Sequence, residues 1–390
     1  MAYLQARLLP ESREKSMPKR ILVTSTDLMM IQFLVPHVIN LSKHGFDVEI
    51  ACSDVGGRVP EIREKLSNYV KTIHIVRLVR SPASPQNIKG YQDMKKVIEK
   101  GRYDIIWTNE PVMGVATRLA ARKARKNGVK VIYMVHGFQF YKGADKKDWL
   151  LFYPVEKFMS LFCDVIVTIN KEDFHRAKEK MYSRVVKYIH GIGVDTSRLQ
   201  FSRESCNIKK ELGLQEDDFL VLSVGELLPR KNQQVIIRAI GKINDSKIHY
   251  IMCGKGAQLN ELKILAQKNG IGEQVHFLGY RNDVLDIYGQ ADLFAFPSRR
   301  EGLGLAGLEA MYCGLPLVSS NTSGPRDYME NGKTGFMYSP DDVDGFAKGI
   351  KVLKDNKELR AKCGNYNRNV VPTFYLERVK DEVIELFMEQ

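Results

Sequence analysis

The chain has 390 residues, of which 44% are hydrophobic and 27% charged, and its formal net charge is +13. That length is enough for two domains with separate hydrophobic cores. Six cysteines without paired spacing exclude a small disulfide-stapled fold and indicate reduced core thiols in a cytosolic protein. No uninterrupted apolar run is long enough to cross a bilayer, since the richest stretch, 150–169, contains Pro154, Glu156, Lys157 and Asp164.

The positive charge is confined to the first half of the chain. Residues 1–198 hold 34 Lys and Arg against 20 Asp and Glu, whereas residues 199–390 hold 25 against 26. A basic domain could bind nucleic acid, anionic lipid headgroups or a phosphorylated lipid. The basic segments, Lys95-Lys96 and 118–130, lack the interleaved aromatic residues of nucleic-acid modules, so nucleic acid is disfavoured as a partner. A merely solvated basic face remains the alternative.

Short β-branched runs alternate with amphipathic stretches of helical length from Ile21 onward. This alternation predicts parallel sheets that are covered by helices on both faces. Residues 1–17 precede the pattern and are predicted to be a mobile tail, or in part an upstream start placed too early; they lack the apolar centre of a secretion signal. The first series of strands is expected at 21–25, 48–52, 72–75, 104–108, 129–135, 165–169 and 185–189, with helices near 32–44, 59–68, 86–100, 112–126 and 149–162. The second series is expected at 219–224, 248–253, 275–278, 293–296 and 317–319.

The two series predict two Rossmann-like domains joined near Gly191 to Asp195, where two glycines follow a strand and can serve as a hinge. The first domain is assigned to 18–194 and the second to 195–371, and a final helix lies within 372–390. His190 precedes the hinge and is interpreted as structural.

The segment Arg300 to Pro316, REGLGLAGLEAMYCGLP, combines two carboxylates, a glycine-rich turn and the start of a helix. The helix is expected to begin near Leu305, so the backbone N–H groups of Gly302, Leu303, Gly304 and Leu305 could receive a diphosphate. Glu301 and Glu309 repel phosphate, but they can accept hydrogen bonds from the vicinal hydroxyls of a sugar ring and a ribose. Taken singly, each glutamate is better interpreted as a solvated residue, Glu301 in a loop and Glu309 on an exposed helix face.

The spacing of Glu301 and Glu309, with seven residues between them, resembles the signature of family 4 retaining glycosyltransferases. The resemblance implies the α/β fold called GT-B, in which two Rossmann-like domains face a cleft and the C-terminal helix crosses back to the first domain. It also implies that the second domain holds a UDP-sugar, with Glu301 on the sugar hydroxyls and Glu309 on the ribose.

Three further turns of the second domain follow predicted strands, where open parallel sheets bind ligands. After the first strand come Gly225 and the cations Arg230 and Lys231, which could neutralise a diphosphate. Family members usually have Arg directly after this glycine; Glu226 stands there instead, so Lys231 carries over more firmly than Arg230. Gly254 could border the nucleoside, and the turn at Arg281 resembles the family's base-binding turn. Ordinary solvated turns are the alternative for all three.

In the first domain, His136 directly follows a predicted strand and is expected to orient the sugar or the acceptor. The surrounding HGFQFYKGA resembles the acceptor-side segment of bacterial polysaccharide glycosyltransferases. Asn109 to Pro111 and Thr24 to Asp27 are expected to line the same cleft.

The resemblance therefore implies transfer of a hexose or N-acetylhexosamine, with retention, from a UDP-sugar to a polyprenyl-diphosphate-linked saccharide in surface polysaccharide biosynthesis. No metal or other cofactor is expected, because no Cys or His cluster has ligand spacing. The protein is expected to be cytoplasmic and to associate peripherally with the anionic inner face of the cell membrane. A UDP-sugar epimerase of the GT-B fold and a non-catalytic nucleotide-sugar-binding protein remain open alternatives.

Overall fold

The computed structural model describes residues 18–54, 59–199 and 207–390. The predicted tail, 1–17, and Cys206 lie outside this part of the chain. The other five cysteines are buried free thiols, as the sequence predicted.

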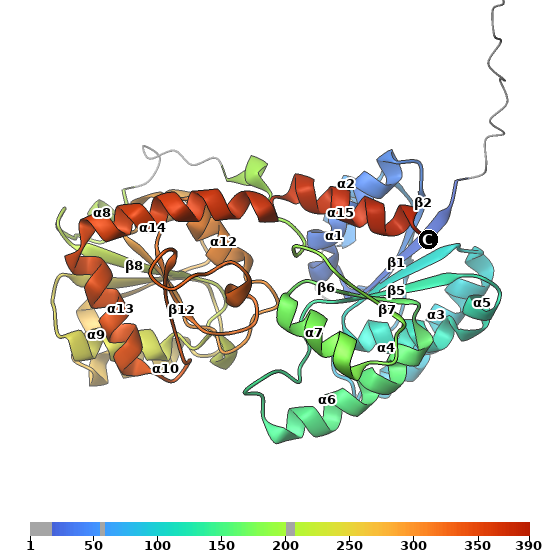
Figure 1. Cartoon of the computed structure of the whole chain (residues 1–390), viewed down its shortest axis with the longest axis horizontal. Helices are drawn as coiled ribbons and strands as arrows, with labels where there is room; N and C mark the ends of the chain where they lie inside the picture. Colours follow the sequence, from blue (N-terminus) through green and yellow to red (C-terminus); the bar gives the residue numbers. More distant parts are fainter. Residues whose placement is uncertain (1–17, 55–58, 200–206) are drawn as a thin grey trace, which may run out of the picture. The chain divides into compact units, whose positions relative to one another are not determined.

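The first sheet has seven strands in the order β3-β2-β1-β4-β5-β6-β7. Strands β1, β2 and β3 pair in parallel, as do β1 and β4, and β5, β6 and β7. Every residue of the central strand β4 is buried, because helices lie on both faces of the sheet (Figure 1). The strands are β1 (Arg20–Asp27), β2 (Asp47–Ser53), β3 (Val70–Ile75), β4 (Ile105–Asn109), β5 (Lys130–Val135), β6 (Val165–Thr168) and β7 (Val185–Tyr188).

The helices that accompany these strands follow the predicted alternation, with shifted ends. Residues 112–126, expected as one helix, form two, because the chain turns at Ala121. The helices are α1 (Leu28–Lys43), α2 (Val59–Leu66), α3 (Gln86–Gly101), α4 (Pro111–Ala120), α5 (Arg122–Lys126), α6 (Lys146–Met159), the 3-10 helix η1 (Ser160–Phe162) and α7 (Lys171–Lys180).

The second sheet has six parallel strands in the order β10-β9-β8-β11-β12-β13. Its core includes the apolar face of α9, from Val235 to Ile240, packed on β8 and β9. Strand β13 was not predicted, because its four residues lie among glycines and polar residues. The strands are β8 (Phe219–Val224), β9 (Ile248–Cys253), β10 (Val275–Gly279), β11 (Leu293–Phe296), β12 (Leu317–Ser320) and β13 (Gly335–Tyr338).

The helices of the second series complete the α/β pattern. They are α8 (Ile208–Glu211), α9 (Gln234–Ile243), α10 (Leu259–Lys268), α11 (Val284–Gln290), α12 (Leu305–Tyr312), α13 (Val343–Asp355) and α14 (Lys357–Val370), followed by α15 (Leu376–Met388). Short 3-10 helices lie at η2 (Thr196–Arg198), η3 (Pro229–Lys231), η4 (Gly272–Gln274), η5 (Pro325–Asp327) and η6 (Val371–Phe374).

The C-terminal helix α15 contacts the end of β7 and the segment that follows it. Glu382 accepts hydrogen bonds from the backbone N–H of His190 (2.9 Å) and pairs with its ring Nδ1 (2.6 Å). The N–H of Leu376 donates to the carbonyl of Val194 at 2.9 Å. His190 therefore holds the last helix against a strand of the first sheet.

By contacts, the chain divides into two compact units. One contains residues up to 108 and 112–131, and the other contains 109–111 and 132–390. The second unit thus includes β6, β7 and most of β5 with the whole second sheet, and the site described below lies in it. The predicted boundary at 194/195 stays a prediction.

Candidate functional site

The sequence-predicted residues Lys231 and Glu301 form an ion pair in the second unit, with Lys231 Nζ 2.6 Å from Glu301 Oε1. Only 15% and 9% of the two side chains are exposed. Lys231 ends η3, which follows β8, and Glu301 follows β11. These two strands are hydrogen-bonded neighbours, and the strand order runs in opposite directions on either side of them. Such a switch point is where open α/β sheets bind ligands.

Two hydrogen bonds to backbone carbonyls hold together the loop that carries Lys231 and the loop that carries Glu301. The N–H of Arg299 donates to the carbonyl of Arg230 at 2.8 Å. Asn232, which adopts the left-handed conformation with φ 57°, donates from Nδ2 to the carbonyl of Pro297 at 3.1 Å. The positions of Lys231 and Glu301 are therefore set by the sheet and these bonds rather than by the ion pair alone.

The glycine-rich turn after Glu301 leads directly into α12. Gly304 is the residue before the helix and has φ 90°, a conformation that favours glycine. A side chain at Gly302 would overlap the carbonyl oxygen of His136, so this turn approaches the end of β5 closely. Leu303 is buried, and α12 begins at Leu305, as predicted. The N-terminal N–H groups of α12 thus lie in the same turn as Glu301, and they favour an anion there.

Glu309 lies on α12, one turn beyond its start, and is partly buried. Burial raises the pKa of its carboxyl to about 7, with small opposing effects from the charge of Arg198 and from a long contact (3.5 Å) with the Tyr288 hydroxyl. The group therefore titrates near neutrality, where a carboxylate that accepts hydrogen bonds from a diol would be stabilised.

The turns after β8, β9 and β10 also meet. The N–H of Gly254 donates to the carbonyl of Gly279 at 2.7 Å, and a side chain at Gly254 would overlap the carbonyl oxygen of Gly225. Nearby, the Arg281 guanidinium pairs with Glu211 (2.7 Å) and Asp283 (2.6 Å), which raise its pKa. These two carboxylates hold the Arg281 side chain against its own turn and α8.

Arg230 is not part of the Lys231–Glu301 pair. Its guanidinium lies 2.7 Å from Glu226, the residue that departs from the family pattern, and both side chains are largely exposed. The two predicted cations therefore belong to different ion pairs: Lys231 to a buried pair with Glu301, and Arg230 to an exposed pair with Glu226.

The predicted His136 is held by the end of β4, with its ring Nε2 2.9 Å from Asn109 Oδ1. Glu110, the next residue, adopts φ 64°, which is strained for a residue with a side chain. His136 thus has a fixed ring orientation at the point where Gly302 packs against its backbone.

Two residues that were not selected from the sequence as site residues also make hydrogen bonds at the glycine-rich turn after Glu301. The Arg300 guanidinium donates to the carbonyl of Gly137 at 2.7 Å and to Gln139 Oε1. Asn170, two residues after the end of β6, donates from Nδ2 to the carbonyl of Gly302 at 2.9 Å. Both were detectable in principle, since Asn170 follows the strand predicted at 165–169 and Arg300 adjoins the Glu-x7-Glu signature.

Residues Thr24 to Asp27 are the last residues of β1, and their expected place in the cleft stays a prediction. Thr24, Ser25 and Thr26 are buried, and the Thr24 hydroxyl lies 2.8 Å from that of Thr108. The Thr24 and Thr108 hydroxyls therefore join β1 to β4. The side chain of Asp27 lies outside the described residues.

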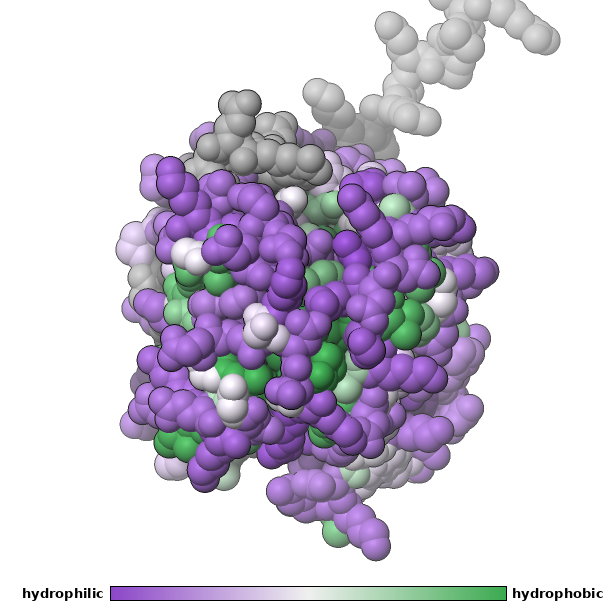
Figure 2. Space-filling view, turned by 90° about the vertical axis from the view of Figure 1, so that its left-hand side faces the viewer, coloured by the Kyte–Doolittle hydropathy of each residue, from purple (hydrophilic) through white to green (hydrophobic). Residues whose placement is uncertain are grey.

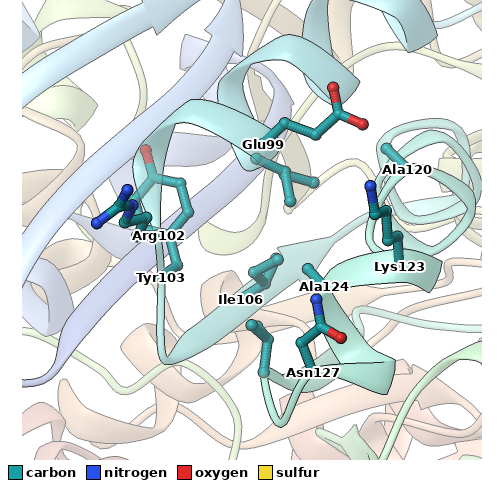
Figure 3. Close-up of a pocket in the computed structure, with 10 residues that line it drawn as sticks. Glu99, Arg102, Tyr103, Ile106, Ala120, Lys123, Ala124 and Asn127 are labelled. Carbon is teal, nitrogen blue, oxygen red and sulfur yellow. The ribbon is translucent and has the colours of Figure 1, made fainter.

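A cavity of about 520 Å³ lies in the first unit, between the end of α3, β4 and α5. Figure 3 shows the side chains that line it. Arg102 and Lys123 line it, and no sequence-predicted site residue does. Across residues 18–54, 59–199 and 207–390, no three His, Cys, Asp or Glu side chains form a group that could hold a metal ion. That the reaction needs no metal stays a prediction.

Two protein-family models match the chain. Residues 37–198 match the model described as Glycosyltransferase Family 4, and residues 204–370 match that of Glycosyl transferases group 1. The chain is 35% identical over 378 residues to the putative glycosyltransferase EpsD of Bacillus subtilis, which covers 95% of this chain and 97% of EpsD. It is 27% identical over 357 residues, 90% of each chain, to an Escherichia coli UDP-Gal:α-D-GlcNAc-diphosphoundecaprenol α-1,3-galactosyltransferase.

Among solved structures, HepE of Anabaena in complex with UDP and glucose aligns with a TM-score of 0.78 and 18% identity, over 95% of this chain and 100% of HepE. This likeness confirms the predicted fold class of two Rossmann-like α/β sheets, the GT-B fold. The chain belongs to glycosyltransferase family 4.

Proposed function

We propose that the protein is a retaining glycosyltransferase that moves a hexose or N-acetylhexosamine from a UDP-sugar to a polyprenyl-diphosphate-linked saccharide in surface polysaccharide biosynthesis. The observation that carries the proposal is the buried Lys231–Glu301 pair beside the start of α12, at the switch point of the second sheet. The printed activity of the E. coli relative, from UDP-Gal to a diphosphoundecaprenol-linked GlcNAc, supports the donor and acceptor classes.

The main catalytic contribution is stabilisation of the leaving group. When the bond between the anomeric carbon and the β-phosphate oxygen breaks, negative charge develops on UDP. The Lys231 ammonium and the N–H groups from Gly302 to Leu305 lie in adjoining loops and suit that charge. Fixed cations and dipoles in a partly dehydrated site stabilise such charge strongly.

Glu301 has two roles in this proposal. Without donor, its carboxylate holds Lys231 in place. With donor bound, the oxygen that does not face Lys231 can accept hydrogen bonds from sugar hydroxyls. The sugar and the diphosphate are thus positioned by one ion pair, which couples recognition of the sugar to stabilisation of the leaving group.

The remaining predicted residues have supporting roles. Glu309 accepts hydrogen bonds from the ribose, Gly225, Gly254 and the backbone at Arg281 border the nucleoside, and Arg230 adds positive charge near the diphosphate. His136, oriented by Asn109, contacts the transferred sugar or the acceptor. Because Lys231, Arg230 and α12 supply the positive charge, we assign no step to a metal ion.

We place the reaction at the cytoplasmic face of a bacterial cell membrane, where a polyprenyl-linked acceptor is presented. The excess of positive charge in residues 1–198 supports an anionic membrane surface as partner and does not favour nucleic acid.

A UDP-release assay tests the proposal, with a panel of UDP-sugars, with and without bacterial lipid extract, and with Glu301→Ala beside the parent protein. Lipid-dependent UDP release that is lost in the variant supports transfer and identifies the donor. Binding of a UDP-sugar without release would favour a binding protein. Conversion of the donor without UDP release would favour an epimerase, and persistence of activity in EDTA would support metal independence.

A further inference from the structure

One face of α6 and η1 exposes a continuous row of large apolar side chains. The row consists of Leu150, Leu151, Val155, Phe158 and Leu161, of which 75%, 64%, 47%, 56% and 45% are exposed. Leu151, Val155, Phe158 and Leu161 are spaced by four, three and three residues, which places them on one side of a helix, and Leu150 adjoins Leu151 at the edge of that side. We call these five residues the apolar row.

The rest of α6 is firmly packed. Trp149 and Tyr153 pack against Phe140 in tilted and edge-on arrangements, with ring centres 5.5 and 5.4 Å from it. Glu156 is buried and accepts a hydrogen bond from the Tyr133 hydroxyl at 2.8 Å. Since these contacts fix the orientation of the helix, the apolar row faces outward as a consequence of the fold.

Other exposed large apolar residues of the described chain are scattered. Apart from Tyr182 and Val185, which follow α7, they are Phe33, Ile75, Ile88, Ile264, Tyr280 and Met388. Figure 2 looks onto the helices of the second sheet, which are drawn on the left of Figure 1. This surface is mainly hydrophilic, with small separate hydrophobic patches. Single exposed apolar residues are ordinary, whereas a contiguous patch marks an interaction site.

Cations and aromatic rings surround the apolar row. Lys146 and Lys147 are exposed at the start of α6, where Lys147 lies 3.2 Å from the exposed Asp145. Lys157 lies beside the row, with its ammonium 4.9 Å from the ring centre of Tyr182, which is itself exposed. An apolar stripe bordered by lysines and tyrosine is the composition of helices that lie in a membrane interface, where lysine side chains reach the headgroups.

We propose that the apolar row and Lys146, Lys147 and Lys157 dock the protein on an anionic lipid bilayer, with α6 lying in the headgroup region parallel to the surface. No helix in the described ranges is long and apolar enough to cross a membrane, so this contact is interfacial. The identity of the bilayer as partner rests on the proposed lipid-linked acceptor.

Charge favours a bilayer over a second copy of the chain as the occupant. In a two-fold symmetric dimer built on this face, the lysines around one apolar row would meet those of the other copy. Anionic headgroups instead complement them.

The position of α6 connects docking to the transfer site. It begins five residues after Tyr141, and the preceding segment from His136 to Gln139 contacts Gly302 and Arg300. A bilayer held by α6 would therefore lie next to the segment that we assign to the acceptor.

Vesicle sedimentation tests this inference. The parent protein should sediment with vesicles of phosphatidylglycerol and phosphatidylcholine and much less with phosphatidylcholine alone. Leu151→Gln/Phe158→Gln should weaken the partition coefficient roughly tenfold or more, because it removes two inserted apolar side chains. Lys146→Glu/Lys147→Glu should remove the preference for anionic lipid. Ile264→Gln, at a singly exposed position of α10, is the matched control and should bind like the parent.

Unchanged sedimentation of the Gln double variant would overturn the inference. Concentration-dependent dimerisation of the parent by light scattering, lost in that variant, would assign the apolar row to a second copy and also overturn it. Binding of UDP by calorimetry should be the same in all these variants, which shows that they are folded. Vesicle binding without UDP release from any UDP-sugar would count against the proposed transferase and leave the docking surface standing.

Discussion

The Lys231 ammonium lies 2.6 Å from a carboxylate oxygen of Glu301, although the two residues are 70 positions apart in the chain. Both side chains are largely buried, so removing either one leaves the other charge with little solvent. The effects of removing Lys231 and of removing Glu301 on activity should therefore not be independent.

We expect Lys231→Ala to lower the rate of UDP release by about 10²- to 10³-fold, the usual effect of removing one group that stabilises transition-state charge. Glu301→Ala should have an effect of similar size, and the double variant should lose much less than the product of the two. Steady-state kinetics with the preferred donor measure this. Lys242→Ala is the control, because Lys242 lies on α9 and forms an exposed ion pair with Asp344 of α13. Multiplicative losses in the double variant would contradict the coupling.

Gly254→Ala should destabilise the protein by about 1–3 kcal/mol and weaken UDP binding, because the added Cβ would overlap the Gly225 carbonyl oxygen and separate two turns of the site. Gly272→Ala is the matched control, since its Cβ would meet only Gln267 at an ordinary 3.4 Å. Thermal unfolding and calorimetry report the two effects. Equal behaviour of the two variants would show that the close approach of the turns is unimportant.

Glu309 should make the binding of a UDP-sugar dependent on pH. Its pKa is raised to about 7 in the free protein, mainly by burial, and the ribose hydroxyls bind the ionised form. Affinity should therefore fall as the pH drops below 7, by at most about tenfold per pH unit. A UDP-sugar is the suitable ligand, because its phosphodiester does not titrate near neutrality. Glu309→Gln should give a flat profile, and an unchanged profile in this variant would exclude Glu309 as the source.

Ionisation of Glu309 should also affect folding stability in the free protein. Because the folded-state pKa is raised above the ordinary 4.5, the stabilising contribution is fully present below pH 4.5 and is lost as the pH rises through about 7. Denaturant unfolding across this range should show a smaller loss for Glu309→Gln than for the parent. The same loss in both proteins would contradict the assignment.

Arg300→Ala should impair transfer more than donor binding. Its guanidinium bonds the carbonyl of Gly137 and Gln139 Oε1, and thus ties the His136 segment to the Glu301 turn. Arg300→Lys keeps the charge but loses the forked geometry, so it should rescue little. We expect a higher KM for the acceptor and a lower kcat, with the Kd for UDP within about threefold of the parent value. Full rescue by lysine would indicate that charge alone matters.

The contact between His190 and Glu382 should stabilise the protein above acidic pH. Burial alone would raise the pKa of Glu382, but hydrogen bonds and charge from His190 outweigh it, so the pKa is lowered below 4.5. This contribution is present above pH 4.5 and is lost as the pH falls through the lowered folded-state value. Glu382→Gln should therefore reduce stability at neutral pH and flatten its acid dependence. Unfolding curves between pH 3 and 7 measure both.

Much of the fold was readable from local patterns. Alternating β-branched runs and amphipathic stretches predicted both sheets, because each strand and helix must bury its own apolar residues. The start of α12 was also predicted, since Gly304 and the apolar run from Leu305 are local signals. The break at Ala121 and strand β13 were missed, because short elements carry too few residues to show a period.

By itself, the sequence determined which residues stand at strand ends, and hence that Lys231 and Glu301 were candidates. Only the tertiary structure decided that they meet, because pairing depends on β11 lying next to β8. The same holds for α6. Its apolar residues are visible in the sequence, but the packing of Trp149 and Tyr153 near Phe140 decides which of them face outward. The spacing of apolar residues predicts that a segment forms an amphipathic helix. Which of its faces is buried depends on residues from distant parts of the chain that pack against it.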